Sequence, residues 1–296
     1  MSFENKVFGN GAVLGCDFVG TVVAAGNSVS RIGNGDKVAG LVWGGETKGI
    51  GAFSEYTIAD EKICFRVPAD IPSAEAVTIP LAGATAWLAL FSHHCLKIRR
   101  EVPHQSILIW GGSSSVGQYA IQIAALYGFN IATTCSPKNF DLVKSLGAKH
   151  AFDYKSDDVA EQIKAAVPNL VFVFDTIGAG ASSATASKAV TGDGVLCTVR
   201  PGKANTEHVA KNVRVTDVLV FTAFLKEHNY GALRWPALRD DHELASEFYD
   251  RLPHWLESVR FKPNSILLLK GLDSVTEGFD LYKQGKISAK KVVYEL

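Results

Sequence analysis

The pattern of hydrophobic and polar positions changes near residue 106. From there to residue 199, short apolar runs alternate with segments whose apolar positions recur at helical spacing. The run 170–174 is apolar throughout, as expected for a strand buried on both faces of a sheet. The runs predict strands at 106–110, 130–135, 150–152, 170–176 and 195–199, and helices between them at 116–127, 139–146, 159–167 and 181–190. This alternation predicts an α/β domain with a Rossmann-type, doubly wound parallel sheet.

The residues before this region follow a different pattern. They are rich in β-branched side chains and in turns that contain glycine, which is typical of an all-β domain. The expected strands are 19–25, 37–42, 53–59 and 63–67. Residues 75–91 then predict one or two apolar helices interrupted at Pro80, because proline ends or kinks a helix.

The last sixty residues or so form a third segment. A long helix is expected over 241–258, followed by a strand at 265–269, a helix at 274–283 and a strand at 291–294. We expect this tail to return to the N-terminal β region. The predicted boundaries are therefore 1–84 for the β domain, 85–235 for the nucleotide-binding domain and 236–296 for the C-terminal segment.

A turn rich in glycine and serine joins the first parallel strand to the first helix of the α/β region. Such a turn places backbone N–H groups and a helix N-terminus where the pyrophosphate of a nucleotide can sit. The alternative is an ordinary tight strand-to-helix turn. The candidate cofactor-binding residues in it are Gly111, Gly112, Ser113, Ser114, Ser115 and Val116.

The composition narrows the classes of function. Lys+Arg and Asp+Glu both number 30, so the net charge is near zero, and no basic run favours nucleic acid or a membrane surface. The five cysteines include no C-x-x-C pair, and the first residues lack the apolar core of a signal peptide. The apolar stretch 79–91 is too short to span a bilayer. We therefore expect a cytoplasmic protein with reduced thiols.

Five ordered motifs connect the chain to a known family. They begin with Gly15-Cys16-Asp17-Phe18-x-Gly20-x-Val22-x-x-x-Gly26, and continue with 52–56 (AFSEY), 79–86 (IPLAGATA), the turn 111–117, and 145–148 (SLGA) before 152–154 (FDY). Together they resemble the medium-chain dehydrogenase/reductase superfamily. Within it the chain is similar to zinc-independent fungal ToxD-type proteins and trans-acting enoyl reductases that serve polyketide synthases. The resemblance implies a GroES-like β domain beside the Rossmann domain.

The second strand of the Rossmann region ends in Ser136-Pro137-Lys138-Asn139. A nicotinamide-binding fold reads the adenosine ribose at this place, and an NAD-preferring protein carries Asp or Glu there. Lys138 can instead pair with a 2′-phosphate, and Ser136 and Tyr154 can bond that phosphate or flank the adenine. The sequence therefore predicts NADPH as the cofactor. The alternative for Lys138 is a solvated surface lysine.

The resemblance also implies roles outside this domain. Thr85 would line the pocket near the nicotinamide and contact the substrate thioester, although a helical threonine also bonds back to its own backbone. Ser288 and Ala289 belong to a segment that closes over the cofactor, whereas Lys290 and Lys291 are interpreted singly as solvated lysines. No metal is expected, because Cys16 and Asp17 replace the family's His and Glu and no cysteine cluster exists. Cys16 is interpreted as a small buried residue.

Relatives in this family carry further strands before Gly15, so we expect an N-terminally truncated β domain. The chain also has no Asp-Trp-Lys sequence, whose lysine is a candidate active-site group in the trans-acting reductases. The expected activity is NADPH-dependent reduction of an activated carbon–carbon double bond in secondary-metabolite or toxin biosynthesis. The alternatives are a catalytically impaired NADPH-binding protein and a free-standing quinone or alkenal reductase. The expected partner is an acyl carrier of a polyketide or fatty-acid synthase, and the protein is a monomer or homodimer.

Overall fold

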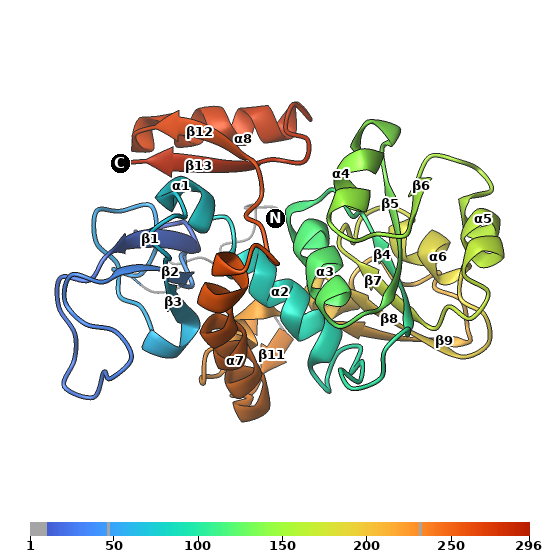
Figure 1. Ribbon diagram of the computed structural model, residues 1–296, viewed down its shortest axis with the longest axis horizontal. Coiled ribbons are helices and arrows are strands. Elements are labelled where there is room, and N and C mark those ends of the chain that lie inside the picture. Colours follow the sequence, from blue (N-terminus) through green and yellow to red (C-terminus); the bar gives the residue numbers. More distant parts are fainter. Residues whose placement is uncertain (1–10, 46–47, 231–232) are drawn as a thin grey trace. The chain divides into compact units, whose positions relative to one another are not determined.

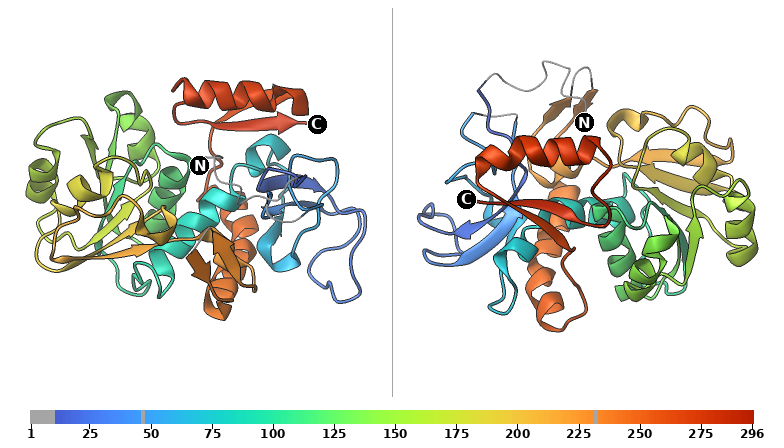
Figure 2. Two further views of the ribbon diagram at one scale, coloured as in Figure 1. Left: turned by 180° about the vertical axis from the view of Figure 1, so that it is seen from behind. Right: turned by 90° about the horizontal axis from the view of Figure 1, so that it is seen from above.

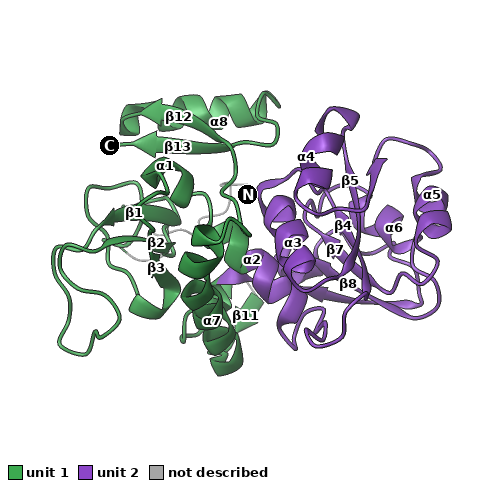
Figure 3. Ribbon diagram, viewed as in Figure 1, with its two compact units in different colours: residues 1–84, 221–296 green, residues 85–220 purple. Residues whose placement is uncertain are grey.

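The structure is a computed structural model that describes residues 11–45, 48–230 and 233–296 (Figure 1). The chain divides into two compact units, which Figure 3 distinguishes by colour. The first unit contains residues 1–84 and 221–296, and the second contains residues 85–220.

The second unit is built on a six-stranded parallel sheet in the order β6-β5-β4-β7-β8-β9 (Figure 2). Its strands are β4 (Ser106–Trp110), β5 (Asn130–Cys135), β6 (His150–Asp153), β7 (Phe172–Asp175), β8 (Gly194–Thr198) and β9 (Val213–Asp217). The connecting helices are α3 (Ser115–Leu126), α4 (Phe140–Ser145), α5 (Val159–Ala166) and α6 (Ser182–Ser187). The strand order reverses direction between β4 and β7, as in the Rossmann fold. The prediction of a doubly wound parallel sheet is confirmed.

The apolar strand residues form the core of this unit. Leu108, Val173 and Leu196, from β4, β7 and β8, are fully buried and belong to one cluster with Ile163 of α5 and Ala186 of α6. Burial of each large aliphatic side chain contributes about 1.5–3 kcal/mol. This core fixes the carboxyl ends of the strands, from which the nucleotide-binding turns emerge.

The first unit combines small sheets with two long helices. An antiparallel sheet contains β1 (Asp17–Thr21), β2 (Lys37–Leu41) and β3 (Cys64–Arg66). The other elements are α1 (Ser73–Ala76), α2 (Pro80–Phe91), the hairpin β10 (His228–Tyr230) and β11 (Leu233–Trp235), α7 (Arg239–Glu257), α8 (Val275–Lys283), and the parallel pair β12 (Ile266–Lys270) and β13 (Lys291–Glu295). Residues of α2 from Thr85 onward belong to the second unit.

Helices α2 and α7 meet inside the first unit. The Tyr249 hydroxyl of α7 donates to the Pro80 carbonyl oxygen at 3.1 Å. A Cβ at Gly83 would lie 2.5 Å from the Phe248 ring, so glycine lets α7 approach α2 closely. The predicted interruption at Pro80 is confirmed, since α1 ends before it and α2 begins with it.

One strand expected from the sequence does not form. Residues 53–59 form no strand, because the Ser54 hydroxyl lies within hydrogen-bond distance of the carbonyl oxygens of Gly51 and Tyr56 in a turn. Compactness groups residues 221–230 and 233–235 with the first unit, whereas the sequence places them in the predicted nucleotide-binding domain 85–235. There Phe221 stacks on Trp43, with ring centroids 4.2 Å apart, and this aromatic contact sets the boundary after Val220.

One helical stretch has the length and composition of a membrane span. It covers Ser73–Phe91, and 83% of its most apolar window is buried inside the structure. A core helix of a globular protein has this character, and it is the interpretation that the burial favours.

Candidate functional site

The turn after β4 requires glycine at three positions. Gly111 has a φ of 85°, which favours a residue without a Cβ. A Cβ at Gly112 would lie 2.0 Å from Thr133 Oγ1, and a Cβ at Gly117 would lie 2.3 Å from the Gly111 carbonyl oxygen. Helix α3 therefore begins in close contact with the strand, and the backbone is open to a ligand at the carboxyl edge of the sheet.

The first turn of α3 offers hydrogen-bond donors to an anion. Ser114 caps the helix, and its Oγ accepts from the Gly117 N–H at 3.0 Å. The N–H groups of Ser113 and Val116 have no hydrogen-bond acceptor among the described residues. The positive end of the helix dipole lies at the same place. These donors fit the pyrophosphate of a dinucleotide.

Thr176 holds this turn in place from the next strand. Its Oγ1 lies 2.8 Å from the Trp110 carbonyl oxygen and 3.0 Å from that of Gly111, so that its proton is shared between them. Ser114 Oγ lies 2.8 Å from Thr176 Oγ1 and can donate to it while accepting from Gly117. Each hydroxyl is thus satisfied as donor and acceptor, and the turn is tied to the end of β7.

The ends of β5 and β6 lie beside this turn. In the register of the sheet, Trp110 of β4 is paired with Thr134 of β5, and Cys135 of β5 is paired with Asp153 of β6. Ser136 and Tyr154 follow directly after that second pair, so they leave the sheet on adjacent strands. Pro137, Lys138 and Asn139 form a short 3-10 turn after Ser136. The predicted residues of the turn and of the second and third strand ends are therefore brought to one edge of the sheet.

The side chains at this edge are accessible. Lys138 is exposed and forms no ion pair with a described residue, and Tyr154 is 44% exposed. Asp153, the acid at the end of β6, accepts from the Lys155 N–H at 3.0 Å. An exposed ammonium and an exposed ring at the end of β5 and β6 fit an adenosine that carries a 2′-phosphate.

Asp175 organises the loop after β7. It is fully buried, and Oδ1 accepts from the N–H groups of Ile177 and Gly178 at 2.9 and 3.0 Å. Oδ2 accepts from the hydroxyls of Ser182 and Ser183, each at 2.6 Å. Four donors offset the cost of burying the carboxylate. Asp175 and Thr176 were not predicted from the sequence, in which an acid that ends a continuous apolar strand was the available signal.

The remaining predicted site residues lie elsewhere in the chain. Thr85 is buried in the second turn of α2, at the start of the second unit. Ser288 and Ala289 belong to the first unit and precede β13, and Ala289 has a φ of 55°. Their roles beside the cofactor stay predictions.

Asp17 and Lys291 join three segments of the first unit. The Asp17 carboxylate forms an ion pair with Lys291 and accepts from the Leu81 N–H at 2.6 Å, in the first turn of α2. Lys291 also donates to the Thr78 carbonyl oxygen at 3.4 Å. The interpretation of Lys291 as a solvated lysine is therefore wrong, because its ammonium has two oxygen partners.

The donor set at the family's zinc position does not fit zinc. Asp17 is engaged by Lys291, and burial together with the Asp17 charge raises the pKa of the Cys16 thiol to about 11. In residues 11–45, 48–230 and 233–296, no three His, Cys, Asp or Glu side chains gather as a metal site.

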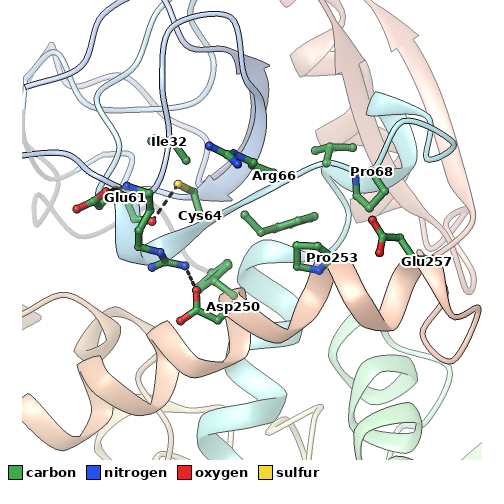
Figure 4. A pocket seen from close by; sticks show the side chains of 12 residues that line it. Ile32, Glu61, Cys64, Arg66, Pro68, Asp250, Pro253 and Glu257 are labelled. Carbon is green, nitrogen blue, oxygen red and sulfur yellow. Dashed lines mark hydrogen bonds and ion pairs between the residues drawn. The ribbon is translucent and has the colours of Figure 1, made fainter.

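A separate cavity of about 540 Å³ lies within the first unit, between β3 and α7 (Figure 4). None of the predicted site residues lines it. Both arginines of its lining are paired, Arg31 with Asp250 and Arg66 with Asp36. The cavity therefore presents no uncompensated charge on its two arginines.

The fold and the turn are those of a dinucleotide-binding protein. Residues 3–69 match the family described as alcohol dehydrogenase GroES-like domain, and residues 115–235 match the one described as zinc-binding dehydrogenase. The trans-enoyl reductase mpsG of Macrophomina phaseolina is 34% identical over 96% of this chain and 83% of its own length. The enoyl reductase cheB of Chaetomium globosum is 34% identical over 100% of this chain and 82% of its own length.

A solved structure agrees in fold. The CurK enoyl reductase superposes with a TM-score of 0.71 at 23% identity, over 95% of this chain and 78% of that one. The chain therefore belongs to the medium-chain dehydrogenase/reductase superfamily, among relatives that include fungal trans-acting enoyl reductases. The expected fold class and family are confirmed.

Proposed function

We propose that this protein is a trans-acting enoyl reductase that uses NADPH to reduce the carbon–carbon double bond of an α,β-unsaturated thioester. The observation that supports this proposal most directly is the arrangement at the carboxyl edge of the sheet. There the Gly111–Val116 turn lies beside Lys138, at a position where an NAD-binding protein would carry an acid. The two relatives named trans-enoyl reductase mpsG and enoyl reductase cheB support the reaction.

Different residues of the second unit would contact different parts of the cofactor. The Ser113 and Val116 N–H groups would hold the pyrophosphate at the α3 N-terminus. Lys138 and Ser136 would hold the 2′-phosphate, and Tyr154 would flank the adenine. NADPH held in this way would supply the hydride for the β-carbon of the substrate, and negative charge would develop on the thioester oxygen.

The chain's own groups stabilise that oxygen. The Thr85 hydroxyl donates to it, backbone N–H groups assist, and solvent delivers the proton to the α-carbon. Zinc takes no part, a proposal that the Asp17–Lys291 ion pair supports. The substrate arrives on the acyl carrier of a polyketide or fatty-acid synthase.

The test measures NADPH oxidation by the purified chain with trans-2-enoyl thioesters of N-acetylcysteamine and with quinones. Turnover of the thioesters with NADPH in preference to NADH is expected. The matched variants are Lys138→Ala and, as a control on the exposed face of α4, Lys144→Ala. Quinone turnover without thioester turnover would instead identify a quinone reductase, and NADPH binding without turnover would identify a binding protein without catalysis.

A further inference from the structure

Arg200 emerges at the same sheet edge as the nucleotide-binding turns. It follows β8 by two residues and is half-buried. Its Nε–H donates to the Gly178 carbonyl oxygen at 2.9 Å, in the loop after β7. The guanidinium therefore lies over the loop that Asp175 organises.

The position of this side chain is well defined. A Cβ at Gly178, whose φ is 58°, would lie 2.5 Å from Arg200 Cγ, so the arginine stem packs directly on the glycine backbone. Gly178 is itself held through its N–H by Asp175, and its carbonyl oxygen accepts a second hydrogen bond from Asn205 Nδ2 at 2.9 Å. A guanidinium fixed in this way loses little further conformational entropy when it binds a ligand.

The two terminal nitrogens of the Arg200 guanidinium make no hydrogen bond to a described residue. Of its five N–H donors only Nε–H has a partner within the described ranges, and no carboxylate pairs with it there. The nearby acids are engaged, since Asp175 accepts four hydrogen bonds and Asp217 accepts from the Gly202 N–H at 2.8 Å. The two terminal nitrogens form a planar fork that matches a carboxylate.

The strand order decides which molecule can supply an anion here. Strand β8 lies two strand spacings from β4, roughly 10 Å, and one further spacing from β5. The 2′-phosphate belongs at the end of β5, three strands from β8, and the pyrophosphate belongs at the β4 turn, where the Ser113 and Val116 N–H groups are its donors. Beyond the reversal of strand order, β7 and β8 form the nicotinamide half of the crevice. An anion on the substrate is therefore the ligand that this position favours.

We propose that Arg200 binds a carboxylate on the acyl chain of the substrate, so that the protein prefers enoyl thioesters of dicarboxylic acids. This inference rests on the proposed function, because it takes the position of the cofactor from it. Exposed Lys203, three residues on, adds positive charge without a fixed position in the loop network.

The test compares two N-acetylcysteamine thioesters, crotonyl and glutaconyl, which differ by one carboxylate. The wild-type protein should show a KM for the glutaconyl thioester lower by about tenfold or more, since hydrogen bonds between charged groups contribute about 1.5–3 kcal/mol. Arg200→Gln should lose this preference, so that its KM values for the two thioesters become similar. Arg200→Lys should recover part of it, and Lys203→Gln is the matched control that should retain it. Equal thermal unfolding midpoints would show that the variants are folded.

A second readout needs no turnover. Calorimetry on the NADP⁺-loaded protein should show tighter binding of the saturated glutaryl thioester than of the butyryl thioester, and Arg200→Gln should abolish the difference. Equal binding of both by the wild-type protein would overturn the proposal. An equal loss of kcat for crotonyl and glutaconyl thioesters in Arg200→Gln would also overturn it, because Arg200 would then act on the developing enolate. Failure to bind NADPH would instead contradict the proposed function, and binding of the two thioesters to the unloaded protein would still decide the role of Arg200.

Discussion

The Lys291 ammonium forms an ion pair with the Asp17 carboxylate, although 274 positions separate the two residues in the sequence. The pair joins the last strand β13 to the first strand β1, and Asp17 also accepts from the first turn of α2. Their side chains are only 20% and 13% exposed. The Thr85 helix and the segment that contains Ser288 and Ala289 thus share one anchor.

Removal of one partner of this pair should destabilise the protein strongly. Lys291→Met leaves Asp17 charged and largely buried, which costs about 3 kcal/mol. Urea unfolding of this variant should show that loss, whereas Lys290→Met, at an exposed neighbouring lysine, should stay within about 0.5 kcal/mol of wild type. The double variant Asp17→Asn/Lys291→Met should recover part of the loss. Equal stabilities of the two single lysine variants would contradict a structural role for the pair.

Ser114→Ala should weaken both the fold and cofactor binding. The substitution removes the cap of α3 and the hydroxyl that links the turn to Thr176, at a cost of about 1 kcal/mol. Ser113→Ala is the matched control for stability, because the Ser113 hydroxyl makes no hydrogen bond within the described chain. Chemical denaturation and NADPH titration of both variants check this. A Ser114→Ala protein as stable as Ser113→Ala would contradict the capping role.

Gly117→Ala should abolish dinucleotide binding. The new Cβ would lie 2.3 Å from the Gly111 carbonyl oxygen and would force the turn away from the strand. Gly33→Ala, where the space is open and φ is ordinary, is the control that should bind normally. Fluorescence titration with NADPH distinguishes them, and unchanged affinity in Gly117→Ala would show that the turn does not form the binding site.

Lys138→Ala should reduce NADPH affinity by about tenfold or more, since a charge-assisted contact to the 2′-phosphate is lost. NADH, which lacks that phosphate, should bind as before, and Lys144→Ala should change neither affinity. Calorimetric titration of both nucleotides measures the ratio. An equal loss for NADPH and NADH would place Lys138 away from the 2′-phosphate.

The stability of the protein should fall at alkaline pH. Burial raises the pKa of the Cys64 thiol to about 12 from its ordinary value of 9.0. Below pH 9 the Cys64 thiol is protonated in both the folded and the unfolded protein, and its contribution to the free energy of unfolding is fully present. This contribution is lost as the pH rises from about 9 toward about 12, because only the unfolded thiol ionises in that window. Cys64→Ala should reduce the slope of unfolding free energy with pH by ~1.4 kcal/mol per unit above pH 9. Equal slopes of unfolding free energy with pH for the wild-type protein and Cys64→Ala, measured by urea unfolding under reducing conditions, would contradict this.

Much of the nucleotide-binding domain follows from the sequence. Strands β4 and β5 have the predicted bounds, because the apolar run of β4 ends at Gly111 and the segment of β5, rich in β-branched residues, ends before Ser136 and Pro137. The turn of β4 and the ends of β5 and β6 were also predictable, since parallel strands bring consecutive strand ends to one edge.

The features that the sequence did not predict depend on distant partners. From the sequence alone Lys291 cannot be distinguished from a solvated lysine, because its ion-pair partner Asp17 lies far away in the chain. Arg200 gains its fixed position only from the Gly178 backbone, 22 residues earlier. Residues 221–235 follow the Rossmann strands in the chain, but the stacking of Phe221 on Trp43 assigns them to the other unit. Contacts between residues so far apart in the sequence leave no local pattern of hydrophobic and polar positions from which they could be predicted.

Transfer of the hydride itself tests the central claim most directly. The purified protein is incubated with NADPH deuterated at nicotinamide C4, in separate samples for each face, and with crotonyl N-acetylcysteamine thioester. Mass spectrometry and NMR of the product should find one deuterium at the β-carbon from one of the two faces, with a solvent proton at the α-carbon. A product without deuterium at the β-carbon, or oxidation of the cofactor without a reduced thioester, would contradict the account.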